Sequence, residues 1–156
     1  MPIRQATAAD VPRILALLQR RREAYQHYAP IFWKIAERAI ETQDPFIRGL
    51  VQNADVLTIV HETRDHVNGV LIATTMNAPP VYDPGGQVCM IDDYVVEHPE
   101  LWQEVGNQLL EYCRDWARTQ GCVLQIIVCA QKDVPKSNML KEMGAEVASE
   151  WYVRAI

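Results

Sequence analysis

The chain has 156 residues, of which 49% are hydrophobic, and this suits one domain built around a single core. No linker, internal repeat or low-complexity tract divides the sequence, so we expect a single domain over 1–156. The formal net charge is -5, which leaves no electrostatic footprint for nucleic acid or an anionic membrane. We therefore expect neither a nucleic-acid partner nor a membrane partner.

The first third of the sequence predicts a short strand followed by helices. Ile3 opens the strand. Thr7 then begins a helix, because its side chain can cap the helix start, and Asp10, three residues later, can complete a capping box and interact with the helix dipole. After Pro30 interrupts the helical pattern, a second helix is predicted over 31–42. The pair Asp44-Pro45 combines a cap with a proline at the first helical position, and it predicts a third, short helix.

Strand character dominates the middle of the sequence. The apolar runs 56–60 and 70–74 predict two strands, and Asn68-Gly69 between them is the strongest short hairpin signal. The loop 77–86 holds three prolines and two glycines, and it leads into a third strand over 88–96. These segments predict three consecutive, hairpin-connected strands.

A helix, a strand, a helix and a strand complete the predicted order. The helix covers 99–119, and the apolar run 123–129 predicts a strand that is buried on both faces. A short helix follows over 133–144, and 147–156 is predicted to be the last strand. Because a helix joins strands 88–96 and 123–129, these two should be parallel. The expected fold is therefore a mixed α/β sheet, mostly antiparallel, flanked by helices.

The cysteines indicate a reducing compartment. Cys89, Cys122 and Cys129 lie within apolar runs, and the spacing of these three and Cys113 matches no metal site. The first ten residues contain no apolar run that could be a signal peptide. We therefore expect a cytoplasmic protein with reduced cysteines and without a metal ion.

Two adjacent acids, Asp92 and Asp93, interrupt the otherwise apolar strand 88–96. A carboxylate in a central strand is costly unless it is paired, so each acid is a candidate either for chemistry or for a salt bridge. In a regular strand, Asp92, Tyr94 and Val96 would share one face, and Ile91, Asp93 and Val95 the other. The catalytic candidates are Asp92, Asp93 and Tyr94; a tyrosine at the position of Tyr94 is more often a half-buried packing residue, although it could also serve as an acid or orient the substrate.

The segment from Tyr94 to Leu110 reads YVVEHPELWQEVGNQLL and passes from strand to helix. It resembles the GNAT acyltransferase superfamily, in which a strand precedes Val-x-Pro-Glu, a Gln/Arg-x-x-Gly-x-Gly/Ala turn and a helix with paired leucines. The order of elements over the whole chain fits this family as well. The resemblance implies acetyl-CoA as co-substrate, with its pyrophosphate held by backbone N–H groups of the turn and by the helix dipole.

The turn itself departs from the family pattern. Aligned on Gly106, the glutamine or arginine position holds Leu101, the next position holds Trp102, and the middle glycine is Glu104. A carboxylate about 4 Å from a diphosphate would cost roughly 1–4 kcal/mol, so Glu104 should turn outward. The backbone donors of 104–108 remain available to the pyrophosphate in either case.

A second departure lies near the C-terminus. There the family reads Asn-x-x-Ala-x-x-Leu-Tyr-Glu-Lys-x-Gly-Phe, and the tyrosine often protonates the departing CoA thiolate. The spacing from Asp133 to Gly144 is kept, but the tyrosine position is Leu140 and the phenylalanine is Ala145. Because leucine carries no proton, the sequence predicts slow transfer or another acid, for which Ser137 is a candidate.

The resemblance also implies the remaining site residues. The coenzyme would contact Val95, Val96, Gln103, Glu104, Val105, Gly106, Asn107, Gln108 and Asp133. The backbone groups of Val95 and Val96 would align the pantetheine arm. The acceptor pocket would be lined by Tyr25, Tyr28, Trp33, Tyr82 and Trp151, although aromatic residues at such positions also serve as core or dimer contacts. Asp92 lies where several members of the family carry a glutamate that deprotonates the substrate.

The sequence therefore predicts an acetyl-CoA-dependent N-acyltransferase, which moves an acetyl group to a small-molecule or peptide amine by direct attack in a ternary complex. The sequence leaves the oligomeric state open, with a homodimer as the first candidate because two-fold dimers are the commonest oligomers. Two alternatives stay open at this point. One is a binding or regulatory module of the same fold without transfer activity, which Glu104 and Leu140 favour. The other is an unrelated α/β protein whose helix start imitates the turn.

Overall fold

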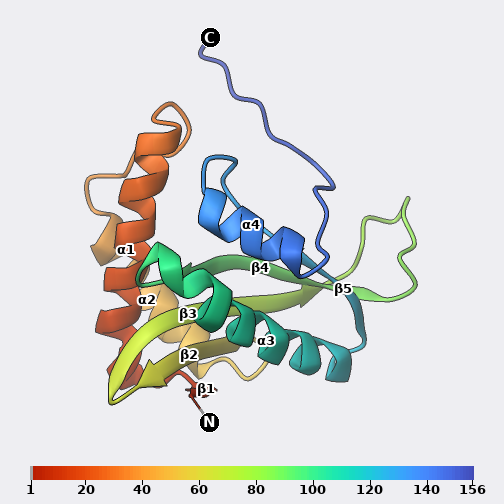
Figure 1. Ribbon diagram of the computed structural model, residues 1–156, viewed down its shortest axis with the longest axis horizontal. Coiled ribbons are helices and arrows are strands. Elements are labelled where there is room, and N and C mark those ends of the chain that lie inside the picture. Colours follow the sequence, from red (N-terminus) through yellow and green to blue (C-terminus); the bar gives the residue numbers. More distant parts are fainter. Residues whose placement is uncertain (1) are drawn as a thin grey trace.

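The computed structural model describes residues 2–156. Within these residues, five strands form one sheet: β1 (Ile3–Gln5), β2 (Leu57–Thr63), β3 (His66–Met76), β4 (Gln87–Val96) and β5 (Cys122–Ile127). The α-helices are α1 (Val11–Tyr28), α2 (Ala39–Gln52), α3 (Asn107–Thr119) and α4 (Val134–Glu142). Figure 1 shows the curved sheet between helices on its two sides.

The topology is the one that the element order predicts. The sheet order is β1-β2-β3-β4-β5, and every neighbouring pair is antiparallel except β4 and β5. That last pair is parallel because α3 carries the chain back between the two strands. The predicted mixed α/β fold is therefore confirmed.

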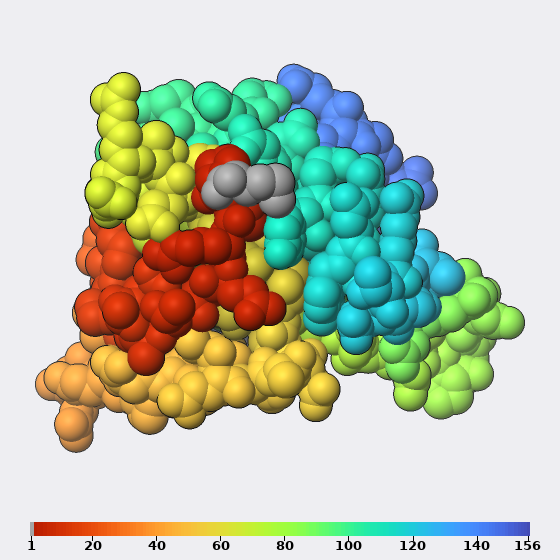
Figure 2. All heavy atoms as spheres, turned by 90° about the horizontal axis from the view of Figure 1, so that it is seen from below, coloured from red at the N-terminus to blue at the C-terminus, as the bar shows by residue number. Residues whose placement is uncertain are grey.

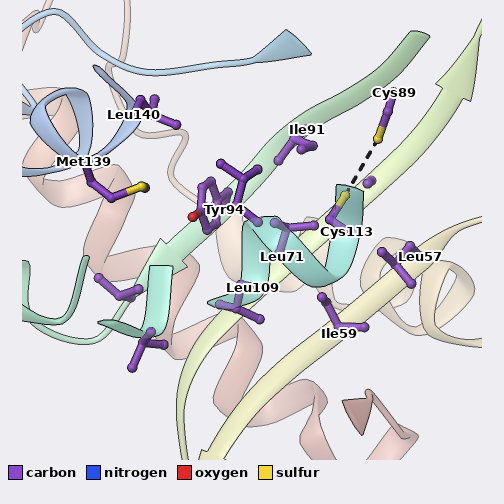
Figure 3. Close-up of a cluster of buried hydrophobic side chains, with 14 of the residues drawn as sticks. Leu57, Ile59, Leu71, Cys89, Ile91, Tyr94, Leu109, Cys113, Met139 and Leu140 are labelled. Carbon is purple, nitrogen blue, oxygen red and sulfur yellow. Dashed lines mark hydrogen bonds between the residues drawn. The ribbon is translucent and has the colours of Figure 1, made fainter. Parts of the chain in front are cut away.

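Each face of the sheet carries its own apolar cluster. On one face, Leu71 of β3 belongs to a cluster with Leu109 of α3 and Met139 of α4 (Figure 3). On the other face, Val70 of β3 belongs to a cluster that Leu18 of α1 and the α2 residues complete. Full burial of such a side chain contributes about 1.5–3 kcal/mol, so these two clusters hold the helices against the sheet.

The β2–β3 hairpin exists, but its turn is not at the predicted residues. Arg64 and Asp65 have positive φ angles of 51° and 60°, which is the geometry of a two-residue type I′ turn. Gly69 instead lies inside β3, where a Cβ atom would be 2.7 Å from Val105 Cγ1. Gly69 is thus required because the helical segment that contains Val105 approaches β3 closely. The prediction of a turn at Asn68-Gly69 was wrong.

A β-bulge in β4 overturns the predicted alternation. The register between β3 and β4 shifts by one residue between Ile91 and Tyr94, so Asp92-Asp93 face a single residue of β3. The extra residue brings Ile91 and Tyr94 into the same cluster, on the side of α3, whereas Val95 packs on the opposite side. Asp92 is exposed and Asp93 is half-buried.

The predicted helix over 99–119 is present but begins irregularly. It opens with a 3-10 turn (Pro99–Leu101), continues as a π-helical turn (Trp102–Gly106) and becomes regular in α3. The Tyr94 hydroxyl donates a hydrogen bond of 2.5 Å to the carbonyl oxygen of Gly106, where the π-turn joins the α-helix. This bond satisfies a buried backbone acceptor at the irregular junction.

A single helix replaces the two that were predicted after α1. Residues 31–38 are irregular, and α2 begins at Ala39 and runs through Pro45. Proline cannot donate to the carbonyl oxygen four residues earlier, which here belongs to Glu41. Glu41 is exposed, so water can occupy that carbonyl, and the helix continues past the proline.

The predicted last strand does not form. Residues 147–156 are not part of the sheet, and Figure 1 shows this segment running away from the body of the molecule beyond α4. Trp151 in this segment is 82% exposed. Because no strand covers it, β5 is an edge strand with Val123 and Leu124 exposed, contrary to the predicted burial on both faces.

Across residues 2–156, no helix combines the length and the apolar character that crossing a membrane requires.

Candidate functional site

The parallel pair β4–β5 opens at the carboxyl end of its strands. The last bond between them runs from the Val128 N–H to the Ile91 carbonyl oxygen, at 3.0 Å. Beyond it β4 continues to Val96 and stays paired with β3, while the chain after Val128 leads into α4. The backbone of β4 therefore has an edge that is not paired with β5 over 92–96.

A groove of about 280 Å³ lies at this opening, between α1, the segment that follows it and β4. Its lining includes Arg21, Arg22, Lys34, Tyr25, Phe32, Trp33, Asp92 and Val128. We call it the Asp92 groove. It combines a carboxylate, cationic side chains and aromatic rings at the point where the two strands separate, which makes it the candidate acceptor site.

Arg21 organises the two acids of the bulge. Its guanidinium donates to Asp93 Oδ1 at 2.6 Å and to the carbonyl oxygen of Asp92 at 2.8 Å. Asp93 is thus ion-paired, which matches the salt-bridge alternative for this residue. The Asp92 carboxylate makes no ion pair within residues 2–156, and it is the acid that lines the groove.

Tyr94, the third catalytic candidate, is a packing residue. It is fully buried, and its ring meets the Trp102 ring edge-on with 4.9 Å between centroids. Its hydroxyl is occupied by the bond to Gly106, and burial raises the pKa of that hydroxyl well above its usual range. Tyr94 does not line the Asp92 groove.

Lys136 of α4 places a buried ammonium group at the strand opening. Its Nζ donates to the carbonyl oxygen of Val128 at 2.8 Å and to that of Tyr94 at 3.2 Å, so it bridges the two separating chains. The side chain is 0% exposed. Burial is the main cause that lowers the pKa of Lys136 to about 8, and the nearby charge of Arg21 adds to it.

Sequence reasoning missed Lys136. In the C-terminal pattern of the resemblance, which begins Asn-x-x-Ala, the alanine position is Lys136. A change from a small apolar residue to a cation on the buried face of a helix was the signal that could have found it.

The open edge of β4 suits the pantetheine arm of coenzyme A. An extended ligand with amide groups can pair with an unpaired strand edge as another strand would. Val95 and Val96, the residues predicted to align this arm, lie in that part of β4. Their side chains are buried on opposite faces of the sheet. The Glu97 N–H donates to the Asn68 carbonyl oxygen of β3, so by alternation the backbone of Val95 also faces β3. The backbone of Val96 is therefore the part of this pair that faces the open edge.

The predicted pyrophosphate donors fit less well. The Asn107 N–H, which belongs to the proposed turn, donates within the helix to Trp102 and Glu104 carbonyl oxygens. Gln103 and Glu104 are exposed, Gln108 is half-buried, and Val105 is buried against the sheet. The residues present therefore fit the arm of the coenzyme, whereas in the predicted pyrophosphate turn the Asn107 N–H is already used within the helix.

Gly106 has a packing role in this segment. A Cβ atom there would lie 2.6 Å from Trp102 Cε3 and 3.3 Å from the Tyr94 hydroxyl. The glycine that anchors the resemblance thus lets the Trp102 ring approach the helix start closely.

The remaining predicted residues separate into several places. Tyr25 and Trp33 line the Asp92 groove, and the Tyr25 hydroxyl donates to Asp133 Oδ2 at 3.2 Å. The Tyr28 ring lies 5.8 Å from that of Tyr25, measured between centroids. Trp151 is exposed and reaches back only to the ring of Phe32, at 5.9 Å.

Tyr82 lies at a different groove, of about 500 Å³, under the loop between β3 and β4. This loop stands out from the surface in light green in Figure 2. The groove is lined mainly by apolar side chains, among them Val88 and Leu124. Tyr82 is thus not part of the Asp92 groove.

The cysteines are free thiols. Cys89 and Cys113 are buried with their sulfur atoms 3.7 Å apart (Figure 3). Burial raises the pKa of the Cys129 thiol to about 11. In the part of the chain that the structure describes, no three His, Cys, Asp or Glu side chains are grouped as metal ligands.

Comparison with known proteins establishes the fold. Neither a protein-family model nor a curated protein matches the sequence. Solved structures do match. A tetramutant of the BH1408 protein from Bacillus halodurans has a TM-score of 0.84 and 14% identity, with 100% of both chains covered.

Two further matches are acetyltransferases. The ribosomal-protein-alanine N-acetyltransferase from Brucella melitensis biovar Abortus 2308 has a TM-score of 0.70 and 14% identity, again over 100% of both chains. A predicted acetyltransferase from Clostridium acetobutylicum, solved with acetyl-CoA, has a TM-score of 0.72 and 14% identity, and covers 98% of this chain and 94% of its own. These likenesses show that the chain has the GNAT acetyltransferase fold.

Proposed function

We propose that this protein, which has the GNAT fold, transfers an acetyl group from acetyl-CoA to an amine bound in the Asp92 groove. The observation that supports this most is a coincidence of position. The β4–β5 pair opens after Ile91 and Val128, and the groove that contains Asp92 lies at the same place. A donor along the open edge of β4 and an acceptor in the groove would then meet at the bulge.

Asp92 is the proposed general base. Asp92 lines the groove, and the Arg21 bond to its carbonyl oxygen fixes the backbone from which its side chain projects. A protonated amine is not a nucleophile, so a carboxylate that removes its proton, directly or through water, makes attack feasible. Asp93 is a positioning residue: its ion pair with Arg21 holds the guanidinium that bonds to the Asp92 carbonyl oxygen.

The charges of the groove favour an amine that also carries an anionic group. Arg21, Arg22 and Lys34 line it together with the single carboxylate of Asp92. Arg21 is occupied by Asp93, and burial followed by repulsion from Arg21 lowers the pKa of Arg22. A carboxylate on the acceptor would offset this excess of positive charge. The proposed acceptor class is therefore small amines with a carboxylate, such as amino acids.

A second function is favoured by specific observations at the other end of the site. Leu140 carries no proton, Gly106 is packed against Trp102, and the Asn107 N–H is used within the helix. A GNAT-fold module that binds coenzyme A or another ligand without transferring an acyl group would need no proton donor at position 140, and one that binds another ligand would not need the pyrophosphate turn either.

Calorimetry with acetyl-CoA and a thiol-release assay separate the two functions. The assay should use a panel of amines, each with and without a carboxylate. We expect binding of acetyl-CoA and thiol release that is faster for the carboxylate-bearing member of each pair. Binding without thiol release from any amine would favour the non-catalytic module, and no binding at all would contradict both functions.

The matched variants Asp92→Asn and Asp93→Asn test the proposed base. Asp92→Asn should lower kcat by about 10²- to 10⁴-fold, the usual contribution of a general base, with unchanged stability because Asp92 is exposed. Asp93→Asn should lower stability, because it removes the partner of Arg21. Equal kcat values for Asp92→Asn and the parent would contradict the role of Asp92.

A further inference from the structure

The ammonium group of Lys136 is the only buried charge that lies at the strand opening within residues 2–156. Its two acceptors, the carbonyl oxygens of Val128 and Tyr94, belong to the two chains that separate there. The rings of Tyr94 and Trp102 lie 4.9 Å and 5.3 Å from Nζ, measured to the centroids. The ammonium therefore touches two carbonyl dipoles and two aromatic faces.

This positive charge is not neutralised by an ion pair with any residue in 2–156. The acids that face it are Asp133, at the start of its own helix, and Asp92 of β4, and neither makes a salt bridge with it. Arg21 of α1 faces it with the same sign of charge, and the Cys129 thiol lies on the segment between β5 and α4. A buried ammonium without a paired carboxylate is costly, and it becomes favourable when an anion forms beside it.

We propose that Lys136 donates the proton to the sulfur atom that leaves coenzyme A in the transfer reaction. This inference rests on the proposed function. Lys136 lies one helical turn before Leu140, the position of the tyrosine in the resembling family, and both side chains are buried on the same side of α4. The side chain of Lys136 thus replaces the missing proton donor from the neighbouring turn.

The step balances without a further reactant. The acceptor reacts as the neutral amine, after its first proton has passed through Asp92 to solvent. The nitrogen then forms the new C–N bond, its remaining surplus proton goes to the Asp92 carboxylate, and the C–S bond of the thioester breaks with its electron pair on sulfur. The Lys136 ammonium gives one proton to that sulfur and becomes a neutral amine. A pKa of about 8 for Lys136 lies close to that of a thiol, about 8.5, so the transfer is nearly balanced in energy.

The hydroxyl groups of the other candidate donors are already used in hydrogen bonds within the protein. Ser137 is half-buried, and its hydroxyl donates to the Val134 carbonyl oxygen at 3.3 Å within α4. The Tyr94 hydroxyl donates to Gly106, and its pKa is raised by burial. The Tyr25 hydroxyl donates to Asp133, and its pKa is also raised by burial.

The first test compares Lys136→Met and Lys136→Gln with the parent. Methionine keeps the unbranched apolar stem, and glutamine keeps an N–H donor for a carbonyl oxygen, but neither titrates. We expect acetyl-CoA affinity within a few-fold of the parent and a loss of about 10²- to 10⁴-fold in kcat. The fall of kcat above pH 8 in the parent should disappear in both variants. Lys132→Met, which removes an exposed lysine before the same helix, is the control.

The second test does not depend on turnover. The ultraviolet absorbance of the thiolate reports the pKa of the thiol in bound, unacylated coenzyme A. An ammonium beside the sulfur should lower this pKa, so it should be lower in the parent than in Lys136→Met by about one unit or more. The same pKa in both proteins would overturn the inference, as would an unchanged kcat and pH profile in both variants.

The outcomes separate the two proposals. If the parent does not bind coenzyme A, the proposed function fails and the inference fails with it. If the parent binds and turns over but the variants lose only affinity, the proposed function stands, and Lys136 is a binding residue, which overturns the inference.

Discussion

Replacement of Lys136 by methionine should change how the stability of the protein depends on pH. The Lys136 side chain is 0% exposed, and its pKa falls from 10.5 to about 8, chiefly because burial disfavours the ammonium form. This difference corresponds to about 3 kcal/mol, since each pH unit is about 1.4 kcal/mol. Between pH 8 and 10.5 the unfolded chain holds the proton more tightly than the folded one. Stability from this group is therefore full above pH 10.5 and is lost as the pH falls to about 8.

Urea unfolding of the parent and of Lys136→Met at several values between pH 7 and 10.5 measures this effect. The parent should gain most of about 3 kcal/mol relative to the variant over this range. The comparison isolates Lys136, because the other titrating groups are present in both proteins. Lys132→Met controls for the loss of one positive charge. Parallel stability curves for the parent and Lys136→Met would refute the assignment of a perturbed, buried ammonium.

Two further predictions concern the irregular start of the helix that follows β4. Gly106→Ala should destabilise the protein by about 1–3 kcal/mol in urea unfolding, because its Cβ would lie 2.6 Å from the Trp102 ring. The control Gly49→Ala, in α2 with open space around it, should stabilise by up to about 1 kcal/mol, and equal effects would contradict the packing role of Gly106. Tyr94→Phe should cost about 1–3 kcal/mol, since it leaves the buried Gly106 carbonyl without its donor, and Tyr82→Phe at an exposed position should cost nothing measurable. If Tyr94→Phe changed the fall of kcat at high pH relative to the parent, the proton donor would instead be Tyr94.

The tertiary structure corrected the predicted alternation of side chains in β4, where one extra residue changes the register with β3. Strict alternation placed Tyr94 with Asp92, and a single extra residue in β4 reversed this, so that Tyr94 entered the core and Asp92 faced the groove. Local periodicity cannot show a bulge, because the bulge depends on how β3 pairs with β4. The Asn68-Gly69 signal failed for a related reason, since a residue far along the chain, Val105, requires that glycine.

The sequence by itself determined the order of the five strands and the parallel β4–β5 pair, although it also predicted one helix before β2 and one strand after α4 that do not form. These features follow from apolar periodicity and from the rule that a helical crossover makes two strands parallel, both of which are local or topological. Only the tertiary structure decided which groups meet at the strand opening. Lys136 is one residue in a short helix, and its importance arises because burial against two separating strands leaves its ammonium without a carboxylate partner. Burial and pairing depend on residues from several elements, so no segment of the sequence carries them alone.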